Sequence, residues 1–122
     1  KLGLAIDSLI KTYEKRLMIV ETAYPYGFEN VDDAGNILGP DAVIPDFPPT
    51  PVGQFEYMMK LTEITVESGG EGVIYWEPAW ISTDCSTRWG KGSHWENATF
   101  FDAKNNNEAL PAFDFFAYGK EE

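Results

Sequence analysis

Two glutamates directly follow short apolar runs, which is a position where a carboxylate can do chemistry. Glu21 comes after Leu17–Val20, and Glu77 comes after Val73–Trp76. A carboxylate at the end of a buried strand is partly desolvated and firmly held, which suits a nucleophile or a general acid or base. Glycosidases work with such a pair of carboxylates. A structural ion pair or hydrogen-bond acceptor suits the same position, so the pattern leaves both roles open for each glutamate.

Aromatic residues surround both glutamates. Tyr24 follows Glu21, and Trp76 and Trp80 flank Glu77 in the run Tyr-Trp-Glu-Pro-Ala-Trp. Flat apolar rings suit stacking on pyranose sugars, and an aromatic content of 15% is more than a small core needs. Core packing accounts for the same rings equally well, so composition does not decide between the two.

The elements that position these residues alternate between helix and strand. Apolar residues recur at helical spacing near the start of the chain, which predicts a helix over residues 2–14. Continuous apolar runs at 17–20 and 72–76 are typical of strands buried on both faces of a parallel sheet. Between them, Thr50-Pro51 predicts the start of a second helix. One face of that helix is predicted to hold Val52, Phe55, Met59, Thr62 and Val66.

The remaining stretches show no period. Residues 27–50 and the stretch from residue 78 to about 108 are predicted loops, and 110–118 a short final helix with Leu110, Phe113 and Phe116 as its apolar residues. Helices alternating with buried parallel strands predict an α/β fold. Both strands carry their polar and aromatic residues at the carboxyl end, where α/β proteins place ligand sites.

Composition excludes several classes of function. Nine basic against twenty acidic residues give a net charge of −11, which disfavours nucleic acids and anionic membranes. No stretch approaches the roughly 18 apolar residues of a transmembrane helix. Cys85 is the single cysteine and His94 the single histidine, so neither a disulfide nor a cysteine or histidine metal cluster is expected within this chain. The length suits one domain, and the start inside a helix without an initiator Met indicates a fragment.

Oxygen-bearing side chains alternate in the first long loop. The run Asn30-Val31-Asp32-Asp33-Ala34-Gly35-Asn36 offers ligands of the kind that calcium uses. It lacks the full spacing of a helix-loop-helix calcium site, and a solvated acidic turn explains it as well.

Three blocks of the chain together resemble glycoside hydrolase family 53, the arabinogalactan endo-β-1,4-galactanases. Residues 17–26, Leu-Met-Ile-Val-Glu-Thr-Ala-Tyr-Pro-Tyr, are similar to the family's seventh barrel strand. Residues 72–81, Gly-Val-Ile-Tyr-Trp-Glu-Pro-Ala-Trp-Ile, are similar to the eighth. The segment from Gly92 to Pro111 resembles the closing segment. The three blocks have the family's order and cover nearly the whole chain.

The resemblance implies that residues 1–122 are the C-terminal fragment of a single glycosidase catalytic domain. The fold would be part of a (β/α)8 TIM barrel, with strands seven and eight and their helices. Such a barrel takes roughly 250 residues, so two strands would leave unpaired edges and a bare apolar face. The rest of the barrel, or another copy of the chain, would cover them, and the isolated fragment is expected to be inactive.

The resemblance also implies roles for the strand-end residues. Glu21 would be the nucleophile of a retaining mechanism, and the acid/base glutamate would lie outside this chain. Trp76 would lie under the sugar at the cleavage point, with Tyr24 and Trp80 lining the cleft. Glu77 would be a supporting residue that contacts substrate rather than the acid/base.

No cofactor is required by this chemistry, but some members of the family hold a structural calcium between the loops after strands seven and eight. The residues at its ligand positions in this chain would be Asn30, Asp32, Asn36, Ser93 and Glu96. Two departures weaken that site: Ala34 replaces a histidine of the pattern, and Asn30 replaces an aspartate.

The expected function is hydrolysis of β-1,4-galactan side chains of pectin by a secreted, periplasmic or cell-surface parent protein. One alternative is another retaining barrel glycosidase, such as a xylanase or mannanase, although the Trp-Glu-Pro-Ala-Trp run favours the galactanases. The other is a non-catalytic carbohydrate-binding protein that keeps the aromatic residues without turnover.

Overall fold

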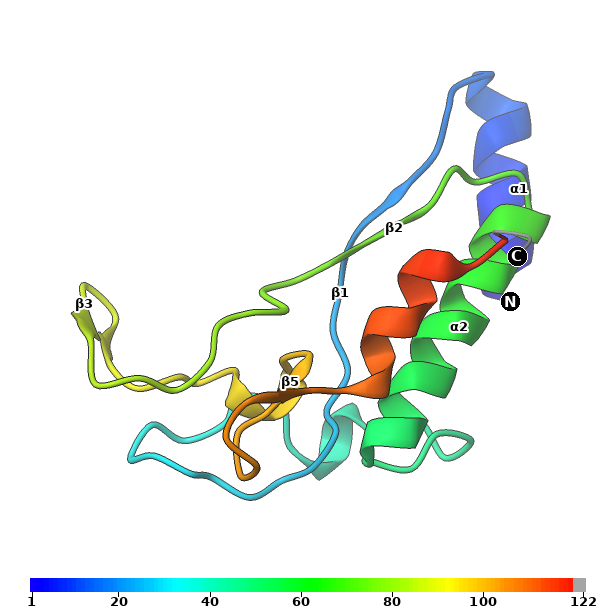
Figure 1. Ribbon diagram of the computed structural model, residues 1–122. Helices are drawn as coiled ribbons and strands as arrows, with labels where there is room; N and C mark the ends of the chain where they lie inside the picture. The colour runs from blue at the N-terminus through cyan, green and yellow to red at the C-terminus, as the bar shows by residue number, and fades with distance from the viewer. Residues whose placement is uncertain (120–122) are drawn as a thin grey trace.

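The computed structural model describes residues 1–119 as a pair of parallel strands with helices on one side and long loops beyond their carboxyl ends (Figure 1). The alternation of helix and strand predicted from periodicity is confirmed. The elements are α1 (Leu2–Tyr13), β1 (Ile19–Thr22), η1 (Pro40–Ala42), α2 (Pro51–Glu67), β2 (Val73–Tyr75), β3 (Ser86–Thr87), β4 (Gly90–Lys91), η2 (Glu96–Ala98), β5 (Phe101–Asp102), β6 (Glu108–Ala109) and η3 (Pro111–Ala117), where η marks a 3₁₀ helix.

The start of α2 follows from the two residues predicted to begin it. The hydroxyl of Thr50 accepts the backbone N–H of Gly53 at 3.0 Å, and Pro51 occupies the first helical turn. Gly53 is required here because a β-carbon at this position would lie 1.8 Å from the carbonyl oxygen of Pro48. The first turn of α2 therefore packs closely against the backbone of the preceding loop.

β1 and β2 pair in parallel through a short ladder. The N–H of Glu71 donates to the carbonyl of Leu17 at 2.8 Å, and the N–H of Ile19 donates to the carbonyl of Gly72 at 3.0 Å. An ion pair between Arg16 and Glu71 lies beside the start of the ladder. Parallel strands need a crossover connection, and α2 supplies it.

The ladder contains a bulge in β1. Ile19 pairs with Val73 and Thr22 pairs with Tyr75, so three steps along β1 match two steps along β2. One extra residue is therefore accommodated between the two paired positions, as in a β-bulge. Glu21 lies within this strand rather than directly after it.

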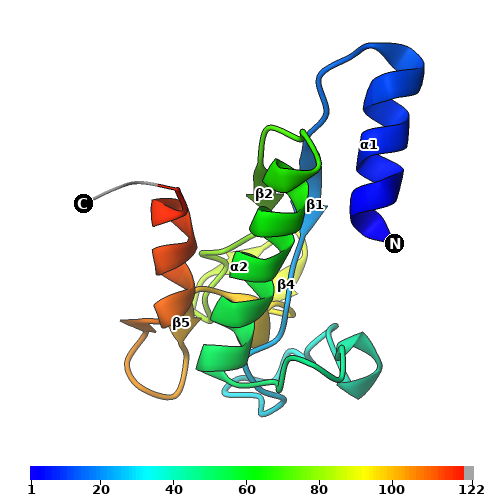
Figure 2. The ribbon, with the colours of Figure 1, turned by 90° about the vertical axis from the view of Figure 1, so that its right-hand side faces the viewer.

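Helices cover one face of the strand pair. Figure 2 shows α2 between α1 and the C-terminal η3, and the packing of α2 against both neighbours agrees with this view. The core beneath this layer consists of Met58, Tyr75, Phe100, Ala112 and Phe115. It therefore joins α2, β2 and the closing segment.

The predicted inner face of α2 is only partly correct, because two of its five residues are exposed and Phe55 and Met59 are half-buried. Of that set only Thr62 is buried, whereas Val52 is 56% exposed and Val66 is also exposed. The helix buries a different set, namely Gly53, Gln54, Met58, Thr62 and Thr65. Polar side chains occupy buried positions because they bond to backbone groups there, which an apolar periodicity cannot reveal.

The opposite face of the strand pair is open in the described chain. Val20 is 67% exposed and Ile74 is 50% exposed, and Met18 beside them is also exposed. Within residues 1–119 the helices lie on one side only, which agrees with the bare apolar face expected of two barrel strands alone.

The long loops contain local structure that the sequence did not predict. η1 lies in the first loop, and the second holds two short antiparallel hairpins, β3–β4 and β5–β6. The final helix is of the 3₁₀ type, and its buried residues are Ala112 and Phe115 rather than Phe116. The exposed thiol of Cys85 lies just before β3. No helix among the described residues is long and apolar enough to span a membrane.

We expect the 122-residue chain, prepared alone, to self-associate through its open strand face. An apolar face with unpaired strand edges is a template for pairing with another copy. The substitutions Val20→Lys and Ile74→Lys place a charge on that face and should shift the mass measured by sedimentation toward the monomer. Val52→Lys is the matched control, because Val52 is similarly exposed but lies on α2. Equal masses for all three variants would contradict the expectation.

Candidate functional site

The bulge in β1 determines where Glu21 points. Thr22 faces α2, since its hydroxyl lies 2.7 Å from the hydroxyl of Tyr57. Val20 and Glu21 occupy the extra space in the ladder, and both are exposed. A regular strand would turn one of two successive side chains toward the helices. The bulge instead leaves both outside the helix-covered face, and Glu21 lies at the carboxyl end.

The backbone that follows Glu21 is held by β2 and by the residue directly after it. The carbonyl of Thr22 accepts the N–H of Trp76 at 2.8 Å, which extends the ladder beyond β2. The N–H of Tyr24 donates to the hydroxyl of Tyr75 at 2.9 Å. Glu21 is therefore held within a bonded segment although its own side chain is exposed.

Trp76 lies next to Glu21 on the neighbouring strand end. Tyr75 is buried on the helix side, so alternation places Trp76 on the open side with Ile74. Its side chain is 45% exposed, and its carbonyl accepts the indole N–H of Trp95 at 3.0 Å. The closing segment thus anchors the strand end that carries the exposed ring. The structure therefore brings Glu21 and Trp76 to the same carboxyl edge of the strand pair, where both side chains are exposed.

Glu77 and Trp80 form the turn after β2. Glu77 is exposed and has a φ of 49°, in the left-handed region that few non-glycine residues adopt. Trp80 is half-buried, and its N–H donates to the carbonyl of Glu77 at 3.3 Å. Strained backbone of this kind is typical of functional sites, where surrounding structure enforces it. It turns the chain away immediately after Trp76.

Tyr24 is not a cleft residue in this structure, which corrects the sequence-based expectation. Its side chain is 2% exposed and stacks on Tyr57 with ring centroids 4.3 Å apart. Its hydroxyl donates to the carbonyl of Phe47 at 2.7 Å and accepts the N–H of Ile44 at 2.9 Å. With its ring covered and its hydroxyl fully used, Tyr24 anchors the first long loop and offers no face to a sugar.

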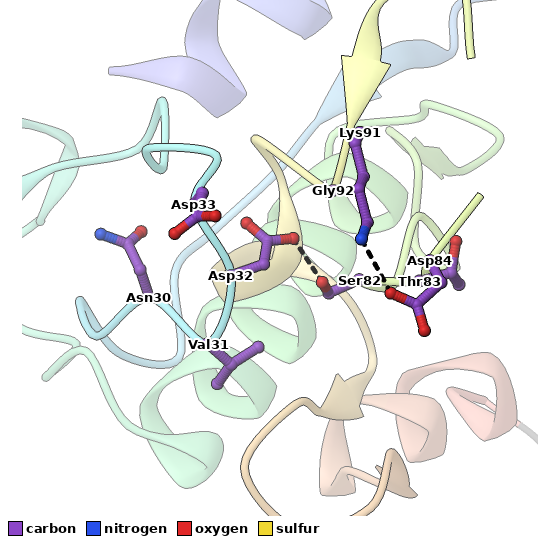
Figure 3. A pocket seen from close by; sticks show the side chains of 9 residues that line it. All are labelled: Asn30, Val31, Asp32, Asp33, Ser82, Thr83, Asp84, Lys91 and Gly92. Carbon is purple, nitrogen blue, oxygen red and sulfur yellow. Dashed lines mark hydrogen bonds and ion pairs between the residues drawn. The ribbon is translucent and has the colours of Figure 1, made fainter. Parts of the chain in front are cut away.

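A polar pocket of about 540 Å³ lies where the loops after β1 and β2 meet (Figure 3). Figure 3 shows Asp32 directed at Ser82 across the gap and Lys91 paired with Asp84. Glu21 does not line this pocket. The pocket is therefore a separate feature, formed by the contact between two loops.

Asp32 is the centre of that contact. One carboxylate oxygen accepts the N–H of Ala34 at 2.7 Å, and the other accepts the N–H of Ser93 at 2.8 Å and the hydroxyl of Ser82. Partial burial raises the pKa of Asp32, but these three hydrogen bonds outweigh it, so the pKa lies below its ordinary value. Gly92 permits the approach, because a β-carbon there would lie 2.5 Å from the Asp32 carboxylate.

Glu96 makes a second bond between the same two loops. Its side chain is 1% exposed, and Oε1 accepts the N–H of Val31 at 2.6 Å. Burial raises the pKa of Glu96, and the bond to Val31 counteracts this only in part. The ring nitrogen Nδ1 of His94 lies 2.8 Å from the carbonyl of Gly35, which adds a third contact between the loops.

The five residues predicted as calcium ligands make hydrogen bonds within and between the loops. Asn30 accepts the N–H of Asn36 at 3.1 Å, and the hydroxyl of Ser93 donates to the carbonyl of Trp80. The oxygens of Asp32 are also used, and Oε2 of Glu96 is the one oxygen among these five side chains that is buried without a partner. Among residues 1–119 no cluster of three acidic, histidine or cysteine side chains is placed to hold a metal.

Two buried polar residues next to the strand end were not predicted from the sequence. Gln54 and Tyr75 are buried and bond to the backbone of Tyr24, just beyond Glu21. The only signal for Gln54 was a polar residue inside an apolar helix, and Tyr75 looked like part of an apolar strand. Their roles depend on loop carbonyls that approach from distant parts of the chain.

The architecture and the strand ends together define an α/β protein with a ligand-binding edge. Parallel strands carry an exposed carboxylate and an exposed indole side by side at their carboxyl ends, where such folds bind ligands. Comparison with known proteins then identifies the family. The family model described as Glycosyl hydrolase family 53 matches residues 1–116. This chain belongs to that family.

Relatives and solved structures agree with the assignment. The chain is 62% identical over 112 residues to the Cellvibrio japonicus protein named arabinogalactan endo-beta-1,4-galactanase, covering 92% of this chain and 30% of the relative. It is 26% identical to the endo-beta-1,4-galactanase of Bacillus subtilis, covering 94% and 34%. The solved GH53 catalytic domain of Ignisphaera aggregans superposes with a TM-score of 0.85 at 28% identity, covering 98% and 34%. The chain spans about a third of the length of these proteins.

We expect the contact between the two loops to be independent of metal. Chelation with EDTA, or addition of calcium chloride, should leave the thermal unfolding midpoint of the protein unchanged. Asp32→Ala should lower the free energy of unfolding by about 2 kcal/mol, because three donors lose a charged acceptor. Asp33→Ala, at the exposed neighbouring position, is the control. A midpoint that falls on chelation in the unmodified protein would contradict this prediction.

The same contact has a defined pH dependence. Because the fold lowers the pKa of Asp32, its contribution is present above the ordinary aspartate pKa of about 3.9. It is lost as the pH falls through the lower pKa of the folded state. Denaturant unfolding of the unmodified protein and of Asp32→Ala should therefore differ at pH 7 and converge in strong acid.

We expect the backbone at Glu77 to store strain that glycine would relieve. Glu77→Gly and Glu77→Ala both remove the carboxylate, but only glycine adopts positive φ without steric cost. The glycine variant should therefore be more stable than the alanine variant by about 1 kcal/mol in denaturant titrations. Equal stability of the two would show that the left-handed conformation carries no cost here.

Proposed function

We propose that this chain forms strands seven and eight, with their helices, of a (β/α)8 barrel whose complete protein is a retaining endo-β-1,4-galactanase. The observation that carries the proposal is the bulge in β1, which leaves Glu21 beside Trp76 on the face that the helices do not cover. In a closed barrel this face is the interior, and the carboxyl edge is the active-site end. The names of the relatives from Cellvibrio japonicus and Bacillus subtilis support the reaction.

In the proposed mechanism Glu21 is the nucleophile. Its carboxylate attacks the anomeric carbon of a galactosyl unit, while a glutamic acid from an upstream strand protonates the departing glycosidic oxygen. The bond to the leaving sugar breaks as the glycosyl–Glu21 ester forms. The upstream glutamate then removes a proton from water, which releases the sugar with its anomeric configuration retained.

The aromatic and backbone features fit supporting roles in that reaction. The exposed indole of Trp76 offers a stacking surface next to the attacking carboxylate, and half-buried Trp80 extends it. The hydrogen bonds around Thr22 and Tyr24 keep the segment after Glu21 in one conformation. A nucleophile held in this way loses little freedom on reaching the transition state, which is a recognised source of rate.

The substrate also implies a location. β-1,4-Galactan is a polymer of the plant cell wall, so an endo-acting enzyme must meet it outside the cell. We therefore place the complete protein among secreted, periplasmic or cell-surface proteins. Its closing partner is the remainder of the barrel, which would cover Val20 and Ile74.

Glu21→Gln in the complete protein tests the assignment of the nucleophile. Glutamine keeps the shape but cannot form the glycosyl ester, so kcat on β-1,4-galactan should fall by about 10³-fold or more. The dissociation constant for galacto-oligosaccharides, measured by titration calorimetry, should stay within about threefold because stacking contacts persist. Glu71→Gln is the matched control, because Glu71 lies just before β2 and pairs with Arg16, at the end of the strand pair opposite to Glu21. This variant should keep full activity.

Substrate comparison separates the proposal from its alternatives. The unmodified protein should release reducing ends from galactan and not from xylan or mannan, and NMR should show a β-configured product first. Faster release from xylan or mannan would assign a different retaining glycosidase. Binding of galactan without any release would assign a carbohydrate-binding protein.

A further inference from the structure

We propose that Tyr75 and Gln54 are positioning residues for Glu21. They act from the helix side of the strand pair, through the backbone of Tyr24. This inference rests on the proposed role of Glu21 as nucleophile. Tyr75 belongs to β2 and Gln54 to α2. These two buried polar side chains, called here the buried unit, contact neither the substrate nor the carboxylate of Glu21.

The hydroxyl of Tyr75 joins two loops. It accepts the N–H of Tyr24 at 2.9 Å and donates to the carbonyl of Ala98 at 2.7 Å. The first partner follows β1 and the second belongs to the closing segment. Tyr75 is 7% exposed, and burial raises the pKa of its hydroxyl, which therefore stays protonated and able to donate.

Gln54 completes the bonding of the same residue. Its side-chain nitrogen donates to the carbonyl of Tyr24 at 2.9 Å and to the carbonyl of Thr99 at 3.1 Å. Gln54 is fully buried, and acceptors surround its nitrogen, which fixes the orientation of the amide. Both backbone polar groups of Tyr24 are thus satisfied by side chains rather than by a strand partner.

This bonding controls the segment that carries Glu21. Thr22, the next residue, is held by Trp76 and Tyr57. Tyr24, two residues further, is held by Tyr75 and Gln54. The bulge leaves Glu21 with no paired residue opposite it, so its direction depends on the anchors on either side. Removing one anchor lets the strand end relax while the core beneath it remains packed.

The buried unit also sets the path of the closing segment. Ala98 and Thr99 are both buried, and Trp95, three residues earlier, donates to the carbonyl of Trp76. The same two side chains therefore connect the strand end of Glu21 with the segment that holds the strand end of Trp76. A shift of about 1 Å between an attacking group and its substrate is enough to cost up to 10²-fold in rate.

Tyr75→Phe in the complete protein tests the inference. The variant keeps the ring in the core and leaves the N–H of Tyr24 without its acceptor. We expect kcat on galactan to fall about tenfold with KM within twofold. The rate of covalent labelling by an activated 2-deoxy-2-fluoro galactoside should fall by the same factor, because labelling requires the attack by Glu21. Gln54→Met, which keeps the volume, should behave in the same way.

Thr65→Val is the matched control. Thr65 is fully buried on the same helix, eleven residues after Gln54, and its hydroxyl donates to the carbonyl of Leu61 at 2.8 Å. It should lower the unfolding midpoint as Tyr75→Phe does but leave kcat and labelling unchanged. If kcat of Tyr75→Phe also stays at the unmodified level, or falls only with the folded fraction, the inference is overturned.

The outcomes separate this inference from the proposed function. Full activity of Glu21→Gln would contradict the assignment of Glu21 as the nucleophile, and the inference that rests on it would fail as well. An inactive Glu21→Gln together with unchanged kcat in Tyr75→Phe and Gln54→Met would leave the nucleophile in place and overturn the positioning role alone. An inactive Glu21→Gln together with a tenfold lower kcat in both variants would support both.

Discussion

The parallel pairing of β1 with β2 is the constraint on which the other features of this chain depend. Parallel strands cannot be joined by a tight turn, so α2 must cross over and lie along one face. The pairing also brings both carboxyl ends to one edge, which puts Glu21 next to Trp76 and sends two long loops out together. The fold thereby separates the chain into a helix-covered face that provides stability and an edge that is free to bind.

The loops beyond the carboxyl ends contain buried backbone N–H and carbonyl groups, and these groups need hydrogen-bond partners. Gln54 and Tyr75 bond to the carbonyl and the N–H of Tyr24, and the carboxylates of Asp32 and Glu96 accept backbone N–H groups where the two loops meet. The interior next to the edge is consequently polar, whereas the core around Met58 and Phe100 is apolar. Each buried polar side chain replaces a strand partner that an irregular segment lacks.

Local rules predicted the elements that depend on local sequence. Thr50-Pro51 began α2 as expected, and the apolar runs became the paired strands with Glu21 and Trp76 on one edge. Features that depend on distant partners could not be predicted in this way. Tyr24 is buried because Tyr57 and the backbone near Phe47 surround it. The inner face of α2 was misjudged because Gln54 and Thr65 are buried through hydrogen bonds, and the bulge appears only when β1 is aligned against β2.

The single extra residue in β1 has a consequence for how this segment can change in evolution. Deleting one residue between Ile19 and Thr22 would restore the regular alternation of side chains along β1. Only one side chain would then point away from α2, where Val20 and Glu21 both do so now. Inserting one would shift the pairing again. The number of residues in this short stretch is therefore fixed by geometry, while the loop over residues 27–50 tolerates changes in length at its exposed turns. Indels among relatives should accumulate there and avoid the strand.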